Sequence, residues 1–433
     1  MRNYMDIQGR HEGSLIHNRN FVLLFLGRMV SRVGDSLYNI GITWFILDLT
    51  GAGTIMSLYL ATGMTTYILM GPLAGVLVDR WNRVRILFVT DLIRGVLISL
   101  AGALYFLGAD PSVFLVILFL ITIATNLCSA LFNPAATALM PNIVSSSQLT
   151  RANSLQSMVD SGSAITGLIL GGIIYTLIGI QGIFIINAFS FLLSGLSEIF
   201  IRIPFKKKED GGERRESGSS VMAILIELKE GFVYIRKERW LFVITVFAFL
   251  INFFINPMMT IYIPYIVNQV LQVEPVYLSY IQASTGVGIL LGSLAMSRQT
   301  QQERIGFKLL RSFSVMMIPL FSVAFVFNYF ILSQMDVLTV ILIFVGSFFV
   351  MGTMMAFVNI PINVLMQKRV PNMLLGRVDA VFSTLLMTGI PIGMIMGGIL
   401  TDWLPMSWIL YATTIALSAI ALVGWLKRSA LDF

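Results

Sequence analysis

The sequence of 433 residues has little charge, a single cysteine and two histidines. Asp, Glu, Lys and Arg make up 12% of the residues, about half the share found in soluble domains. Cys128 has no partner for a disulfide, which excludes a disulfide framework and a cysteine-based metal site. His11 and His17 both precede the first apolar run, which excludes a histidine-ligated metal centre inside the apolar part of the chain. We therefore expect neither a metal nor a bound cofactor.

Apolar residues, at 57% of the sequence, gather into long runs separated by short polar segments. A helix needs about 20 apolar residues to cross the hydrocarbon core of a bilayer, and the cost of unpaired backbone groups there favours helices. The sequence predicts an all-α membrane protein with twelve transmembrane helices. The predicted spans are 20–47, 54–78, 85–107, 113–133, 154–177, 181–201, 240–267, 276–297, 309–330, 336–358, 376–401 and 406–426.

Basic residues are distributed asymmetrically between the two sets of loops. The loops after the odd-numbered spans contain no Lys or Arg, only acids such as Asp110 and Asp402, whereas the tails and the other loops are rich in both basic residues. By the positive-inside rule, both termini are expected in the cytoplasm. The net charge of +7 then reports membrane topology, and we expect the lipid bilayer rather than a nucleic acid as partner.

The longest loop, 202–239, divides the chain into two predicted six-helix bundles, 20–201 and 240–427, with cytoplasmic tails 1–19 and 428–433. The first part of this loop is polar. Its second part has apolar residues at helical spacing and charges opposite, which predicts an amphipathic helix. Two interpretations stay open: a helix on the inner membrane surface, or a linker helix packed on the bundle.

An internal repeat relates the two halves. A shift of 226 positions aligns eight identical residues between 133–172 and the second half without a gap. Parallel six-helix halves are the layout of rocking transporters, which bind substrate between the halves. The matched pairs are Asn133 and Asn359, Leu139 and Leu365, Met140 and Met366, Arg151 and Arg377, Ser157 and Ser383, Gly167 and Gly393, Gly171 and Gly397, and Gly172 and Gly398.

The second loop, from Gly75 to Arg85, resembles the Gly-x-Leu-x-Asp-Arg-x-Gly-Arg-Arg/Lys motif of the major facilitator superfamily. Asn82 and Val84 depart from that pattern. The small Gly75 is expected to permit close helix approach, and the resemblance implies that the charged residues latch a cytoplasmic gate. A charged turn that only obeys the positive-inside rule is the alternative. The residues assigned to the gate are Gly75, Asp79, Arg80, Arg83 and Arg377.

Span five contains Gly-Leu-Ile-Leu-Gly-Gly at 167–172, which resembles the Gly-Pro-x-x-Gly-Gly motif of antiporters in that family, with Leu168 in place of proline. Glycines at this spacing also form a groove for close helix packing, and that role alone is the simpler interpretation. The expected packing glycines are Gly167, Gly171, Gly172, Gly393, Gly397 and Gly398.

We single out six charged residues inside the spans of the first half, where each costs at least about 2.5 kcal/mol unless it is paired or solvated. One interpretation is mutual neutralisation. The other makes Asp35 the proton carrier, paired with Arg32 at helical spacing, with Asp160 as the next candidate. The proton-coupling candidates are Asp35, Asp160 and Asp91, and their charge partners are Arg28, Arg32 and Arg94.

Aromatic and methionine side chains of the second half predict an adaptable apolar wall for an amphiphilic substrate. Ordinary packing is the alternative for most of them. The candidate lining residues are Phe254, Met258, Tyr262, Phe357 and Met387.

Longer stretches, among them 73–94 and 133–157, resemble the macrolide-efflux-like, twelve-helix drug exporters of the superfamily. The resemblance implies a monomeric secondary transporter in a bacterial cytoplasmic membrane that exports small amphiphilic compounds, such as macrolide-like antibiotics, in exchange for protons. No phosphate-binding loop for ATP is found. Export of an endogenous metabolite such as a siderophore, and lipid transport, are alternatives. A membrane sensor or a membrane-embedded enzyme is disfavoured.

Overall fold

A computed structural model describes residues 15–202, 221–298, 305–328 and 335–426. Within these ranges the chain forms helices and connecting turns, and no strand is present. This confirms the all-α fold class. The helical state follows from the length of the apolar runs, because a helix satisfies its backbone hydrogen bonds within one segment.

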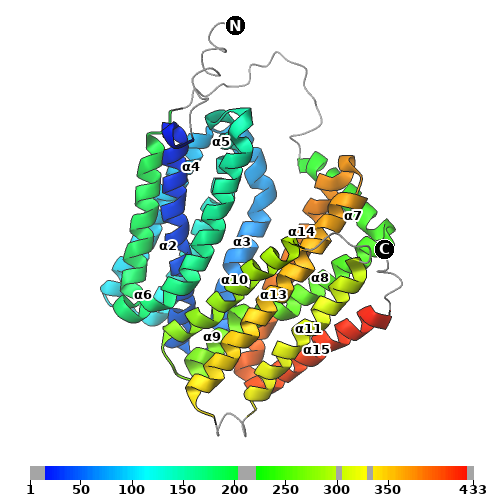
Figure 1. The fold of residues 1–433 in the computed structure, drawn as a ribbon. Coiled ribbons are helices and arrows are strands. Elements are labelled where there is room, and N and C mark those ends of the chain that lie inside the picture. The colour runs from blue at the N-terminus through cyan, green and yellow to red at the C-terminus, as the bar shows by residue number, and fades with distance from the viewer. Residues whose placement is uncertain (1–14, 203–220, 299–304, 329–334, 427–433) are drawn as a thin grey trace. The chain divides into compact units, whose positions relative to one another are not determined.

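Five long helices make up the first half (Figure 1). The fifth covers predicted spans five and six together, and it changes direction at Gly179, whose φ of +63° is a left-handed conformation that favours glycine. The helices are α2 (Arg19–Thr50), α3 (Gly53–Arg80), α4 (Arg83–Phe106), α5 (Pro111–Ile143) and α6 (Leu149–Ile199).

The second half begins with the linker helix α7 (Val221–Lys237). Predicted span seven is α8 (Arg239–Pro257), continued through two π-helical turns at Met258–Tyr262 and Ile266–Val270 that flank the short α9 (Ile263–Tyr265). The remaining helices are α10 (Pro275–Ser297), α11 (Ile305–Val326), α13 (Val337–Arg369), α14 (Asn372–Trp403) and α15 (Met406–Leu426).

Nine helices in the described ranges are long and apolar enough to cross a membrane. The count of twelve crossings, with both ends in the cytoplasm, stays a prediction.

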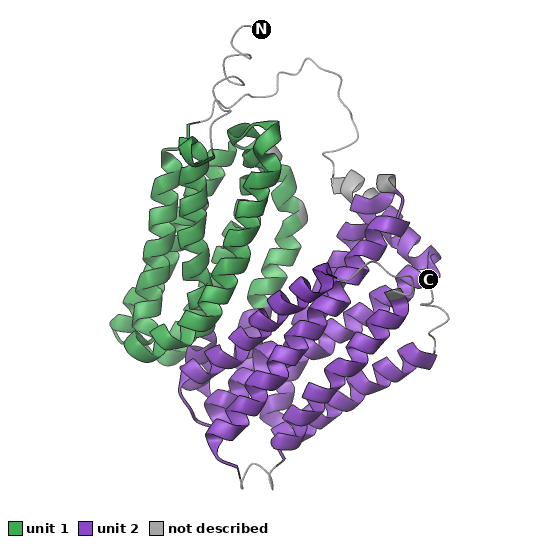
Figure 2. Ribbon diagram, viewed as in Figure 1, with its two compact units in different colours: residues 1–42, 62–221 green, residues 43–61, 222–433 purple. Residues whose placement is uncertain are grey.

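The chain divides into two compact units, coloured separately in Figure 2. One consists of Met1–Ile42 and Thr62–Val221, and the other of Thr43–Ala61 and Met222–Phe433. The hairpin between α2 and α3 belongs to the second unit because the carboxylate of Asp402 accepts hydrogen bonds from the backbone N–H groups of Gly53 and Thr54, at 2.8 and 2.9 Å. An acid at a helix N-terminus satisfies otherwise unpaired donors.

Glycines set the helix spacing within the first unit. Gly167 and Gly171 of α6 lie against Ser36 and Ile40 of α2, and a Cβ added at Gly171 would lie only 2.8 Å from the Cβ of Ile40. Any larger residue would push the two helices apart. Gly172 is buried on the same helix.

The equivalent glycines act alike in the second unit. Gly393 of α14 lies against the backbone of Phe253 in α8, and a Cβ at Gly397 would lie 2.9 Å from Pro257. Gly398 packs against Ser57 of the α2–α3 hairpin. The aligned glycines of the repeat therefore occupy close helix contacts in both units.

The linker helix α7 packs on α14. Its Gly231 lies against the backbone of Arg377, Glu230 forms an ion pair with the Arg377 guanidinium, and Ile235 is buried in the core. Of the two interpretations of the amphipathic segment, the contacts favour a helix packed on the bundle.

Reporter fusions test the topology. A fusion after Trp81 or Lys237 is expected to report the cytoplasm, and one after Ala109 the outside, because the loops that contain basic residues stay inside. A cytoplasmic signal at Ala109 would contradict the helix count.

Candidate functional site

Two arginines of α2 pair with one acid of α6. The Nη2 atom of Arg28 lies 3.0 Å from Oδ2 of Asp160, and Nε of Arg32 lies 3.3 Å from Oδ1 of the same carboxylate. Arg28 and Arg32 are four residues apart, so both side chains leave the same face of α2, which the packing glycines hold close to α6. Arg32 also donates to Oδ1 of Asn133 at 2.5 Å.

Arg32, the expected partner of Asp35, pairs with Asp160 in the structure instead. Asp35 is partly buried and has no hydrogen bond or ion pair with any described residue, although Arg32 and Arg94 act on it electrostatically. Asp35 thus has no direct cationic partner among the described residues.

A second pair lies on α4. Arg94 forms an ion pair with Asp91 one helical turn earlier, and both side chains are buried. The Arg94 guanidinium also stacks over the rings of Phe132 and Phe191, at 4.8 and 4.4 Å from their centroids. Aromatic faces attract a cation most strongly where water is excluded.

Sequence reasoning missed Glu198, which lies at the end of α6 and joins this second pair. Its exposed fraction is 0%, and neither carboxyl oxygen accepts a hydrogen bond of ordinary geometry within the described residues. Asp91, Arg94 and Arg28 act on it electrostatically, and the Ser194 hydroxyl lies beside it. The signal was available, since Glu198 is an acid inside predicted span six.

With Glu198, the first unit has four acids within its predicted spans, against three arginines besides Arg85, which is exposed at the start of predicted span three. Since an unpaired buried charge is costly, the excess acid is the electrostatic feature that distinguishes this cluster. We call these seven residues the charge cluster: Asp35, Asp91, Asp160, Glu198, Arg28, Arg32 and Arg94.

Two of the predicted gate residues, Arg80 and Arg83, lie where α3 ends and α4 begins. Arg83 donates to the carbonyl of Ala138 in α5 at 2.8 Å, and Arg80 is exposed at the end of α3. A Cβ added at Gly75 would meet no described atom within 4 Å, and the close helix approach expected there stays a prediction. The side chain of Asp79 lies outside the described residues.

The predicted lining residues differ in exposure. Met258 and Tyr262 are buried, with 1% and 4% exposed, because the continuation of α8 packs under α14 near Gly397. Phe254 and Phe357 are partly buried, and Met387 is exposed.

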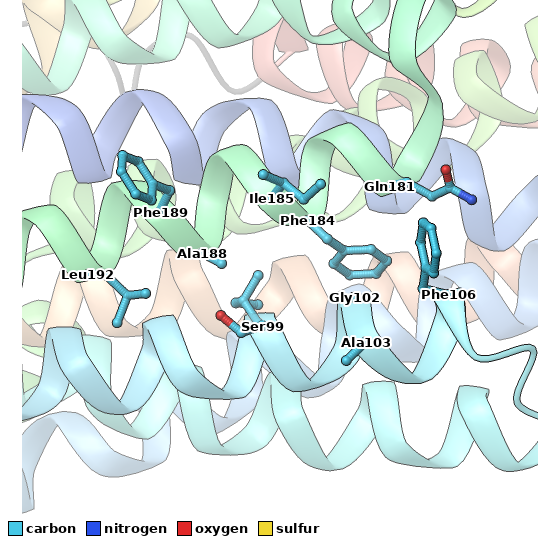
Figure 3. Close-up of a pocket in the computed structure, with 11 residues that line it drawn as sticks. Ser99, Gly102, Ala103, Phe106, Gln181, Phe184, Ile185, Ala188, Phe189 and Leu192 are labelled. Atoms are coloured by element: carbon cyan, nitrogen blue, oxygen red, sulfur yellow. The ribbon is translucent and has the colours of Figure 1, made fainter.

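A cavity of about 350 Å³ lies between α4 and α6 in the first unit (Figure 3). Apolar side chains dominate its lining, with Ser99 and Gln181 as polar members, and no charged residue contributes. Phe106, Ile185 and Phe189 are largely exposed. An uncharged groove with exposed apolar walls is typical of a lipid-facing surface, and it does not include the charge cluster.

The model of the Major Facilitator Superfamily matches residues 24–387. The chain belongs to this superfamily. Its members are transporters rather than enzymes, and the efflux transporters among them draw energy from an ion gradient without a cofactor. This chain is accordingly a multi-pass membrane transporter of small substrates.

Relatives of this superfamily member include efflux proteins. Macrolide efflux protein A of Streptococcus pyogenes is 25% identical over 93% of this chain and 94% of its own. The multidrug efflux pump Tap of Mycolicibacterium fortuitum is 22% identical over 92% of both chains. Among solved structures, an inward-facing bacterial homologue of the iron transporter ferroportin matches with a TM-score of 0.71 at 16% identity, over 97% of this chain and 100% of that one.

The transporter's buried acids offer a test of shared pairing. Asp91→Asn and Glu198→Gln each leave one of these two acids beside Arg94, whereas the double variant leaves neither. We expect the double variant to lose more unfolding free energy than the sum of the single variants, by about 0.5–3 kcal/mol. Chemical unfolding in micelles measures this difference, and strict additivity would refute a shared cation.

Proposed function

We propose that this transporter exports small amphiphilic compounds, macrolide-like antibiotics among them, in exchange for protons by alternating access. The observation that carries the proposal is the charge cluster, in which four acids face three arginines. One carboxyl group more than the arginines can neutralise is a ready site for a proton.

The direction of transport and the class of substrate are inferred from relatives. Proteins named for macrolide and multidrug efflux match more than nine tenths of this chain at 22–25% identity. Each match also covers more than nine tenths of the relative's own length. We place it in a bacterial cytoplasmic membrane, as a monomer with both termini inside.

Within the charge cluster we assign the exchanged proton to Asp35. Its neighbours Arg28 and Arg32 are both used by Asp160, so Asp35 lacks the direct cation that would hold it ionised. A movement of α2 against α6 that transfers Arg32 from Asp160 to Asp35 would favour proton release from Asp35. Asp160 would then be the next site to take up a proton, and Asp91 the third candidate.

Transport in inverted membrane vesicles with an imposed pH gradient tests the coupling. The native protein is expected to accumulate a macrolide, and a protonophore is expected to abolish the accumulation. Asp35→Asn should still insert and exchange substrate downhill, because Asn resembles the protonated acid, yet its pH-driven accumulation should fall to that of empty vesicles.

Asp110→Asn is the matched control. It makes the same chemical change in a loop, where Asp110 caps α5, and Asn caps helices as well as Asp does. Full pH-driven accumulation by folded Asp35→Asn would move the assignment to Asp160. Accumulation that is unaffected by the pH gradient in the native protein would refute proton coupling.

The cytoplasmic gate is assigned to the loop between α3 and α4. By resemblance to the family motif, Asp79 and Arg83 latch this gate, and the Arg83 bond to Ala138 of α5 anchors the loop to a neighbouring helix. Arg377, aligned with Arg151 by the repeat, is assigned to the corresponding region of the second half, where it pairs with Glu230.

Asp79→Asn tests the latch. We expect normal insertion with a several-fold loss of transport rate, since only the closed gate is weakened, and Asp110→Asn again serves as control. Equal transport rates in the Asp79→Asn variant and the native protein would reduce Asp79 to a residue of the topology signal.

A further inference from the structure

A second cavity, of about 230 Å³, lies inside the second unit. Four helices line it, namely α8, α11, α13 and α14, and none of the five predicted lining residues contributes. The described residues that line it are Ile244, Phe247, Ala248, Ile251, Asn252, Leu309, Leu310, Phe313, Val358, Asn359, Ile362, Asn363, Asp379, Phe382, Ser383 and Leu386.

Five polar side chains converge on this cavity from three helices. Asn359 and Asn363 are four residues apart on α13, and Asp379 and Ser383 are four residues apart on α14, so each pair shares one helix face. Asn252 joins them from α8. Asp379 is the one charged residue among the described lining residues, and neither Lys nor Arg is among them.

These polar groups are available to a ligand. Asn359, Asn363 and Asp379 are exposed and have no hydrogen bond or ion pair with another described residue. The repeat gives a contrast, because Asn133, the counterpart of Asn359, accepts from Arg32 and donates to Tyr67 at 3.3 Å. The amide that is used internally in the first half is thus unused in the second.

The remaining wall is apolar and aromatic. Phe247, Phe313 and Phe382 stand around the polar groups, and Phe382 is buried in the core of the second unit. Aromatic faces attract cations, and a single carboxylate among neutral amides gives the cavity a negative potential. Apolar walls with a few convergent polar groups are the usual form of a small-molecule site.

We propose that this cavity binds the positively charged head of an amphiphilic substrate, with a protonated amine at Asp379 and oxygen groups at the amides of Asn359 and Asn363. The proposal rests on the proposed function and narrows its substrate class to cationic amphiphiles. Because drug-sized sites occupy about 300–1,000 Å³, a cavity of 230 Å³ holds a head group rather than a whole large molecule.

Equilibrium dialysis of the purified full-length protein in nanodiscs tests the charge preference. Tetraphenylphosphonium and tetraphenylborate are the probes, because they share size and shape and differ in the sign of charge, with empty nanodiscs subtracted. The native protein should prefer the cation. Asp379→Asn should lose about tenfold or more in affinity for the cation, the loss expected when a charged partner is removed from a site.

Two further variants separate charge from folding. Asp110→Asn should bind the cation as the native protein does, and Asp379→Glu, which keeps the charge, should recover most of the lost affinity. Monodisperse elution of Asp379→Asn from a size-exclusion column shows that it is folded. If that variant is misfolded, Asn363→Leu takes its place, because it removes an amide and keeps the carboxylate. It is expected to weaken the binding of a hydroxylated amine and to leave the binding of tetraphenylphosphonium unchanged.

The outcomes distinguish this inference from the proposed function. Unchanged cation affinity in folded Asp379→Asn, or equal affinity of the native protein for both probes, would overturn the cationic site while pH-driven export stands. A native protein that accumulates no amphiphile in vesicles would instead overturn the proposed function.

Discussion

Close helix approach at glycines is the contact on which the rest of this structure depends. Lipid tails are as apolar as side chains, so helices in a bilayer associate through tight van der Waals packing rather than through the hydrophobic effect. Gly167 and Gly171 bring α2 against α6, and Gly393 and Gly397 bring α14 against α8. The first of these contacts also carries Arg28 and Arg32 to Asp160. Electrostatics within the first unit therefore follows from backbone spacing.

The two halves related by the internal repeat differ in chemistry. Buried acids and arginines concentrate in the first, and Glu198 brings the acids to four against three arginines. In the second, the cavity between α8, α11, α13 and α14 offers unused amides and one carboxylate. Our proposals assign proton exchange to the first half and recognition of a cationic head group to the second, so that each half contributes one part of a coupled cycle.

Polar contacts at the helix ends link segments that are far apart in the sequence. The Asp402 carboxylate accepts hydrogen bonds from the first backbone N–H groups of α3. The Gln269 side chain donates a hydrogen bond to the carbonyl of Leu47 near the end of α2, at 3.0 Å. The net contribution of such a hydrogen bond to stability is about 1 kcal/mol between neutral groups and about 1.5–3 kcal/mol to a charged group such as the Asp402 carboxylate. Contacts of this modest strength suit a transporter, because they stabilise one arrangement of helices and can still break during a conformational change.

The sequence by itself determined the helical fold, the internal repeat and the family, because apolar length and residue spacing are local properties that a bilayer constrains strongly. It also located six of the seven residues in the charge cluster. Only the tertiary structure decided the pairing: Arg32 meets Asp160 rather than Asp35, Glu198 joins Asp91 and Arg94, and Tyr262 is buried. The partner of a side chain depends on which helix faces pack together, whereas the periodicity of a helix does not. Residue spacing along one helix therefore cannot specify which residue of another helix lies beside it.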